Sequence, residues 1–116
     1  MSPMARGVRR AGRVTAAFET SVDCADGAVV VTVRGEVDME TAPVLWDAVE
    51  QAFSAGDRLV LDLSEMTFID SSGLGVLIRA HQLLGPHEAL VIRSPNPQAS
   101  RLFETAGVEA LLRIEP

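Results

Sequence analysis

The sequence predicts one α/β domain with a mostly parallel central sheet that begins with an antiparallel hairpin, and about three helices. Its 116 residues, 47% of them hydrophobic, are enough for a single core. Short strand-like runs alternate with amphipathic segments of helix length, which is typical of βαβ crossovers. Asp26-Gly27 separates the first two runs and is a hairpin turn signal.

The expected strands are short runs rich in apolar and β-branched residues, at 15–23, 28–34, 59–63, 89–92 and 111–114. The run at 59–63 is interrupted only by Asp62, so it is expected to be a central strand that is covered on both faces or has parallel neighbours. Residues 35–38 are expected to leave the second strand as a loop.

The expected helices have apolar residues at a 3.6-residue period and recognisable ends. The first runs from the cap Thr41 to about Ser54, and the second covers 72–84. The third opens at Asn96-Pro97 and closes before Gly107. Trp46 lies beside the apolar stripe of the first helix, so it is either a flanking core residue or a partly exposed partner contact.

Charge divides the chain into a basic arm at 1–14, expected to be disordered, and a domain at 15–116. Four arginines and no acid occur in 1–13, whereas the rest has six arginines against all sixteen acidic residues, a net charge of −10. An acidic body argues against nucleic acid as a partner. Apolar runs are too short for a membrane span or a signal peptide, and Cys24 is the only cysteine, so a cytoplasmic protein is expected.

The run Asp-Ser-Ser-Gly-Leu-Gly at 70–75 is the most informative part of the chain. It stands between a predicted buried strand and a predicted helix, where the helix N-terminus favours negative charge. Ser71 is therefore a natural target for a reversible phosphate. The alternative is that Asp70 or Ser71 only caps the helix. Gly73 and Gly75 each lower the stability of a helix by up to ~1 kcal/mol relative to alanine. Their presence in the first turns therefore favours an outward helix face without side chains, which a partner can approach closely.

Asp38 ends the 35–38 loop and is expected at the same sheet edge as Asp70, where the ligands and partners of α/β proteins gather. The alternative is that Asp38 is a helix cap. Catalysis is not expected, because it needs a base beside Ser71, and the two histidines are expected two turns along the same helix (His81) and in the loop beyond it (His87). The chain also has no Gly-x-Ser-x-Gly elbow, no metal-ligand spacing, and only half of a dinucleotide fingerprint at 73–75, so no cofactor is expected.

Four stretches of the sequence resemble the STAS domain and, within it, the anti-sigma factor antagonists of bacteria. These are Gly-Glu-Val-Asp at 35–38, Leu-Val-Leu-Asp-Leu-Ser at 59–64, the run from Phe68 to Leu77, and the tail at 101–108. The resemblance covers about residues 16–115, and the Asp-Ser-Ser-Gly-Leu-Gly run is its most specific part.

The resemblance implies a partner-switching protein without enzymatic activity. Its phosphorylated serine would be Ser71, and its kinase would be the anti-sigma factor itself. The unphosphorylated form would bind that factor and release the sigma factor, and a serine phosphatase would reset the switch. A monomer or weak dimer is expected. The rival reading is a ligand-sensing or scaffold STAS module that binds a nucleotide or a lipid at the same edge of the sheet, or a subunit of a stress-sensing complex. The residues expected to contact the partner are Asp38, Asp70, Ser72, Gly73, Leu74 and Gly75.

Overall fold

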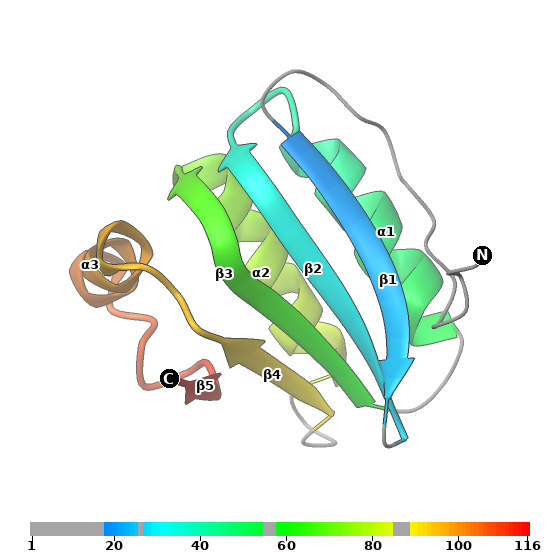
Figure 1. The fold of residues 1–116 in the computed structure, drawn as a ribbon. Coiled ribbons are helices and arrows are strands. Elements are labelled where there is room, and N and C mark those ends of the chain that lie inside the picture. Colours follow the sequence, from blue (N-terminus) through cyan, green and yellow to red (C-terminus); the bar gives the residue numbers. More distant parts are fainter. Residues whose placement is uncertain (1–17, 26, 55–57, 85–88) are drawn as a thin grey trace.

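The computed structural model describes residues 18–25, 27–54, 58–84 and 89–116. They form five strands and three helices in the predicted order (Figure 1). The elements are β1 (Phe18–Ala25), β2 (Ala28–Val37), α1 (Ala42–Ser54), β3 (Arg58–Ile69), α2 (Ser71–Leu84), β4 (Leu90–Arg93), α3 (Pro97–Ala106) and β5 (Ile114–Glu115). The predicted arm at 1–14, Asp26 of the hairpin turn and His87 lie outside the described residues.

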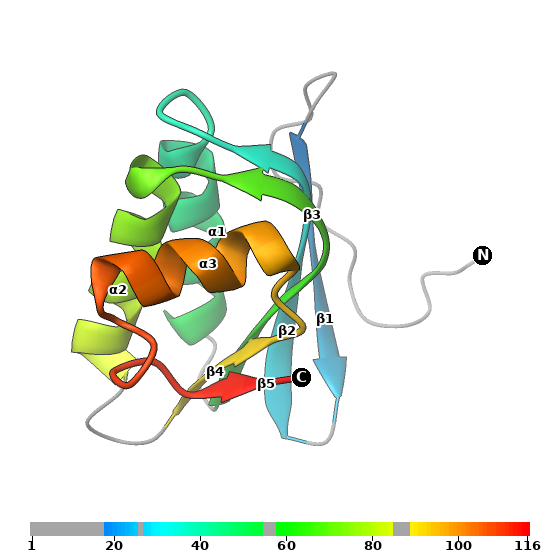
Figure 2. The same ribbon diagram turned by 90° about the vertical axis from the view of Figure 1, so that its left-hand side faces the viewer.

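The strands stand in sequence order across one sheet, β1-β2-β3-β4-β5. The pair β1–β2 is an antiparallel hairpin, and the three following pairs are parallel. The predicted fold class is therefore confirmed, and β3 is a central strand with parallel neighbours on both sides. Because each right-handed crossover moves one strand further in the same direction, the three helices come to lie on one face of the sheet (Figure 2).

The core lies between that face and the helices. Alternate residues of β2 point into it, and Val31 and Val33 are fully buried. Leu45 of α1, Leu77 of α2 and Phe103 of α3 meet them from the helical side. Trp46 is only 8% exposed and belongs to this core, so the reading of it as a flanking core residue is the correct one.

Two strands are longer than predicted, and this correction bears on the site. β2 continues to Val37, so the expected loop at 35–37 is wrong, and β3 continues to Ile69 instead of ending at 63. The two extensions pair with each other through a register shift between Gly35 and Glu36, and Gly35 has a φ of 90° that favours glycine. Ser64, Glu65 and Thr67 are polar and exposed, so residues 64–68 lack the continuous apolar run that would have extended the predicted strand.

Other element ends agree more closely with the sequence. Asn96 caps α3 through its side chain, which accepts the Ala99 N–H at 2.8 Å, and Gly107 closes the helix with a φ of 73°. The last strand is Ile114–Glu115 and not 111–114. Within the described ranges, no helix has both the length and the apolar character needed to cross a bilayer.

Candidate functional site

The strands β2 and β3 end side by side, and this brings the two predicted loops together. Val37 is the register partner of Ile69, and the Val37 carbonyl accepts the Asp70 N–H at 3.0 Å. Asp38 and Asp70 therefore leave the sheet from neighbouring positions at the carboxyl ends of parallel strands. The prediction that they share one edge of the sheet is confirmed.

Asp70 is the cap of α2. Its Oδ1 accepts the N–H groups of Ser72 at 2.8 Å and Gly73 at 3.2 Å, and its carbonyl accepts the N–H of Leu74 at 2.9 Å. Of the two candidates that the sequence left open, the aspartate holds the helix start. Ser71 is the first residue of α2 and is exposed, and the cap does not depend on its hydroxyl.

The two glycines of the motif have different roles. Gly73 is buried, and a Cβ at this position would lie 2.6 Å from Cγ1 of both Ile69 and Val37. Leu74 is buried in the core at 5% exposure. The expectation that Gly73 lies on an outward face is therefore wrong, since this glycine lets α2 pack onto the strand ends. Gly75 is exposed, and a Cβ there would meet nothing within 4 Å, as predicted for an open surface.

Asp38 organises the turn before α1. Its Oδ1 accepts the N–H groups of Glu40 at 2.9 Å and Thr41 at 3.0 Å, and its carbonyl accepts the Ala42 N–H at 2.8 Å. The Thr41 N–H, together with the other donors, holds the pKa of the Asp38 carboxyl below its usual value. Asp38 therefore holds the turn at 39–41, and the alternative reading of it as a helix cap is corrected, because its Oδ1 accepts N–H groups that precede α1.

Thr41 does not cap α1 with its side chain, which corrects the prediction. Its hydroxyl turns back to accept the Asp38 N–H at 2.9 Å and to donate to the Glu36 carbonyl at 3.0 Å. The residue is 7% exposed, so its hydroxyl closes the turn from within. The Thr41 carbonyl, and not its side chain, accepts the N–H groups of Val44 and Leu45 in the first turn of α1, each at 3.0 Å.

A groove of about 440 Å³ runs between the starts of α1 and α2. Met39 and Trp46 line it from the α1 side, and Ser72, Gly75 and Arg79 line it from the α2 side. The Arg79 guanidinium lies 3.9 Å from the centroid of the Trp46 ring, so it covers that ring where the groove passes. The groove brings the two predicted turns into one continuous surface.

Sequence reasoning did not identify two exposed apolar residues close to the turns in the sequence, of which Met39 also lines the groove. Met39 is 77% exposed and Phe68 is 40% exposed. Met39 follows Asp38 directly, and Phe68 stands three residues before Ser71. The sequence offered one signal for them, because each is an apolar residue close to a candidate site residue. That signal indicates a shared surface only once the strands β2 and β3 are known to end side by side.

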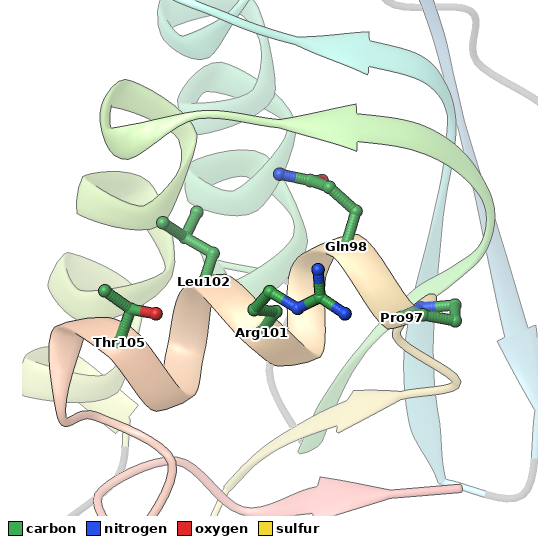
Figure 3. Close-up of a pocket in the computed structure, with 5 residues that line it drawn as sticks. All are labelled: Pro97, Gln98, Arg101, Leu102 and Thr105. Carbon is green, nitrogen blue, oxygen red and sulfur yellow. The ribbon is translucent and has the colours of Figure 1, made fainter.

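A second groove, of about 390 Å³, follows α3 (Figure 3). Its lining residues are Pro97, Gln98, Arg101, Leu102 and Thr105. Within the part of the chain that the structure describes, no group of three or more His, Cys, Asp or Glu side chains is placed to hold a metal ion.

Known proteins show the same fold and related sequences. The family described as "Mlab, STAS domain" matches residues 20–113. The chain is similar to an anti-sigma-B factor antagonist of Listeria monocytogenes, with 34% identity over 87 residues that cover 73% of this chain and 76% of the relative. It is also similar to an anti-sigma F factor antagonist of Paenibacillus polymyxa, with 28% identity over 76% of this chain and 78% of the relative.

Among solved structures, the chain is similar to the crystal structure of an anti-sigma factor antagonist from Mycobacterium paratuberculosis. The TM-score is 0.79 and the sequence identity 32%, and the match covers 85% of this chain and 86% of that one. The likeness in sequence and in fold thus spans most of both proteins. The chain belongs to the STAS-domain family, in the group of bacterial anti-sigma factor antagonists.

Proposed function

We propose that this protein binds an anti-sigma factor that is also a serine kinase, and thereby releases the sigma factor. Phosphorylation of Ser71 ends that binding, and a serine phosphatase restores it. The observation that carries the proposal is the exposed Ser71 at the first position of α2, beside an aspartate that already caps the helix. The names of the relatives from Listeria and Paenibacillus support the anti-sigma factor as partner. The protein acts by binding and not as an enzyme.

The proposed docking face consists of the Asp38 turn, Met39, Ser71, Ser72 and Gly75. Its support is the groove that joins Met39 to Ser72 and Gly75, together with the high exposure of Met39. Exposed apolar side chains with polar groups at the rim are typical of protein interfaces.

The other three predicted contact residues, Asp70, Gly73 and Leu74, support the docking face structurally. Asp70 caps the helix start, and Gly73 and Leu74 pack it onto the core. We therefore assign these three residues a structural role, in which they hold the docking face in place. The partner contacts the exposed residues around them.

Phosphate on Ser71 would change the interface more than the fold. It adds a charge of about −1.5 to −2 beside the Asp70 carboxylate. The helix N-terminus stabilises a negative charge by about 0.3–1 kcal/mol, so the domain stays folded. An unpaired charge buried in an interface costs several kcal/mol, and a loss of about 2.7 kcal/mol already lowers affinity ~100-fold. A local charge is therefore sufficient for the switch.

The test is a binding titration with the purified anti-sigma factor kinase of the source organism. Ser71→Ala is expected to bind like the unphosphorylated protein, and Ser71→Asp is expected to bind about 100-fold more weakly. Ser100→Asp is the matched control, because it adds the same charge at an exposed serine of α3, outside the docking face, and is expected to bind like the wild type. Equal affinity of Ser71→Ala and Ser71→Asp would contradict the switch.

Mass spectrometry of phosphopeptides after incubation with the kinase and ATP tests the choice of serine. Ser72→Ala is expected to accept phosphate, with at most the modest stability loss of a weakened helix start. Ser71→Ala is expected to accept none. Label found on Ser72 alone would overturn the assignment of the residue.

A further inference from the structure

The edge of β3 that faces α3 extends well beyond its neighbouring strand. β4 pairs with β3 only from Leu59 to Asp62, whereas the opposite edge of β3 pairs with β2 as far as Ile69. In the described part of the sheet, the main chain of 63–69 thus has a strand neighbour on one side only. Buried backbone N–H and carbonyl groups need partners, so something else must satisfy this edge.

Two side-chain amides at the start of α3 take the place of the missing strand. The Asn96 Nδ2 donates to the Met66 carbonyl at 2.8 Å. The Gln98 Oε1 accepts the Ile69 N–H at 3.0 Å, and its Nε2 donates to the Ile69 carbonyl at 2.8 Å. One primary amide therefore satisfies both backbone groups of one residue, as a paired strand residue would. Figure 3 shows Gln98 extending from α3 toward β3.

The residue that Gln98 holds is the last one before the site. Ile69 is fully buried and directly precedes Asp70, whose own N–H donates to the Val37 carbonyl at 3.0 Å. The junction between β3 and α2 is thus fixed by β2 on one side and by Gln98 on the other. The close packing of Gly73 on Ile69 then sets where α2 begins.

We propose that Gln98 is a positioning residue for Ser71. Its amide fixes the main chain of Ile69, and through the Asp70 cap it determines how Ser71 is presented to the kinase. The proposal rests on the proposed function, since it assumes that Ser71 accepts phosphate. It also assigns α3, which contributes no residue to the docking face, a part in the switch.

The amide chemistry suggests three informative variants. Gln98→Ala removes both hydrogen bonds. Gln98→Glu keeps an acceptor for the Ile69 N–H but places a carboxylate oxygen against the Ile69 carbonyl, so it is expected to behave like Gln98→Ala. Thr105→Ala is the matched control, because it alters an exposed residue of the same helix and the same groove.

The first measurement is amide hydrogen exchange by NMR on the full chain. In Gln98→Ala and Gln98→Glu, the Ile69 amide is expected to exchange at least about 10-fold faster, whereas the core amides of Leu61 and Ile92 keep their protection. The side-chain NH₂ of Gln98 in the wild type is expected to exchange slowly, because it donates to a buried carbonyl. An unchanged Ile69 amide would overturn the inference.

The second measurement is the rate of Ser71 phosphorylation by the anti-sigma factor kinase. In both Gln98 variants kcat is expected to fall about 10-fold while KM stays within about two-fold, because the docking face is intact but the serine is misplaced. Thr105→Ala should match the wild type. Unchanged kcat in Gln98→Ala, with the wild type phosphorylated, contradicts this inference alone. A wild type that accepts no phosphate contradicts the proposed function, and the inference falls with it.

Discussion

The two turns at the carboxyl ends of β2 and β3 use the same hydrogen bonds but lead to different surfaces. In each, an aspartate Oδ1 accepts the N–H groups two and three residues ahead, and the aspartate carbonyl accepts the N–H four residues ahead. After Asp70 the helix starts at once, with Ser71. After Asp38 three residues intervene, and Met39 among them is 77% exposed.

The residue three positions after each aspartate explains the difference. In the first turn it is Thr41, whose buried hydroxyl accepts the Asp38 N–H and donates to the Glu36 carbonyl. In the second it is Gly73, which lets the helix sit directly on the strand ends, where the Val37 carbonyl accepts the Asp70 N–H. One hydrogen-bond pattern of an aspartate therefore builds either a protruding turn or a tight helix start, according to which residue packs beneath it.

The largest expected effect tests the tight helix start. Gly73→Ala places a Cβ 2.6 Å from Cγ1 of both Ile69 and Val37, two fully buried side chains, and is expected to lower the free energy of unfolding by about 1–3 kcal/mol. Gly75→Ala makes the same change in open space and is expected to be neutral or to stabilise by up to ~1 kcal/mol. Urea unfolding followed by circular dichroism compares the pair. Equal midpoints would show that Gly73 is not needed for packing.

The next effect concerns the corresponding position in the first turn. Thr41→Val keeps the shape of the side chain but leaves the Asp38 N–H and the Glu36 carbonyl without their partner, which is expected to cost about 1–3 kcal/mol. Thr41→Ser keeps the hydroxyl and is expected to lose less. Thermal unfolding of the two variants measures the difference. If valine were tolerated as well as serine, the hydroxyl would not be what closes this turn.

A smaller effect is expected from the cap of α2. Asp70→Ala removes the acceptor for the N–H groups of Ser72 and Gly73, and a lost cap typically costs about 1 kcal/mol. Asp70→Asn retains the Oδ1 acceptor and is expected to stay within a few tenths of a kcal/mol of the wild type. Denaturant unfolding at constant pH makes the comparison. If the alanine variant were as stable as the asparagine variant, the Asp70 side chain would not be what caps α2.

The smallest expected effect is the pH dependence of the first turn. Because the folded pKa of Asp38 is lowered, its charge contributes stability above the usual carboxyl pKa of about 4, and this contribution disappears as the pH falls through the lowered value. The stability difference between wild type and Asp38→Asn is therefore expected to be constant between about pH 7 and 5 and to shrink below about pH 4. A difference that grows in acid would mean that the pKa is raised. Unfolding curves across this range provide the measurement.

Local pattern alone determined much of this molecule. The alternation of strand and helix signals predicted the order of all the elements, and Asn96 and Gly107 correctly marked the ends of α3. Such features depend on residues close in the chain, whose periodicity and capping chemistry are visible without a fold. The special character of 70–75 was visible for the same reason, since two hydroxyls and two glycines at a helix start are a local anomaly.

Only the tertiary structure decided what depends on residues distant in the chain. The extensions of β2 and β3 exist because each supplies the other's hydrogen bonds, and exposed polar residues such as Glu36, Ser64 and Glu65 interrupt the apolar pattern there. The burial of Gly73 follows from its packing against Val37. The hydrogen bonds between Gln98 and Ile69 join residues that are 29 positions apart in the sequence. Propensity and periodicity act within one element, whereas close packing and hydrogen-bond satisfaction act between elements, so these parts of the site emerge only when the chain has folded.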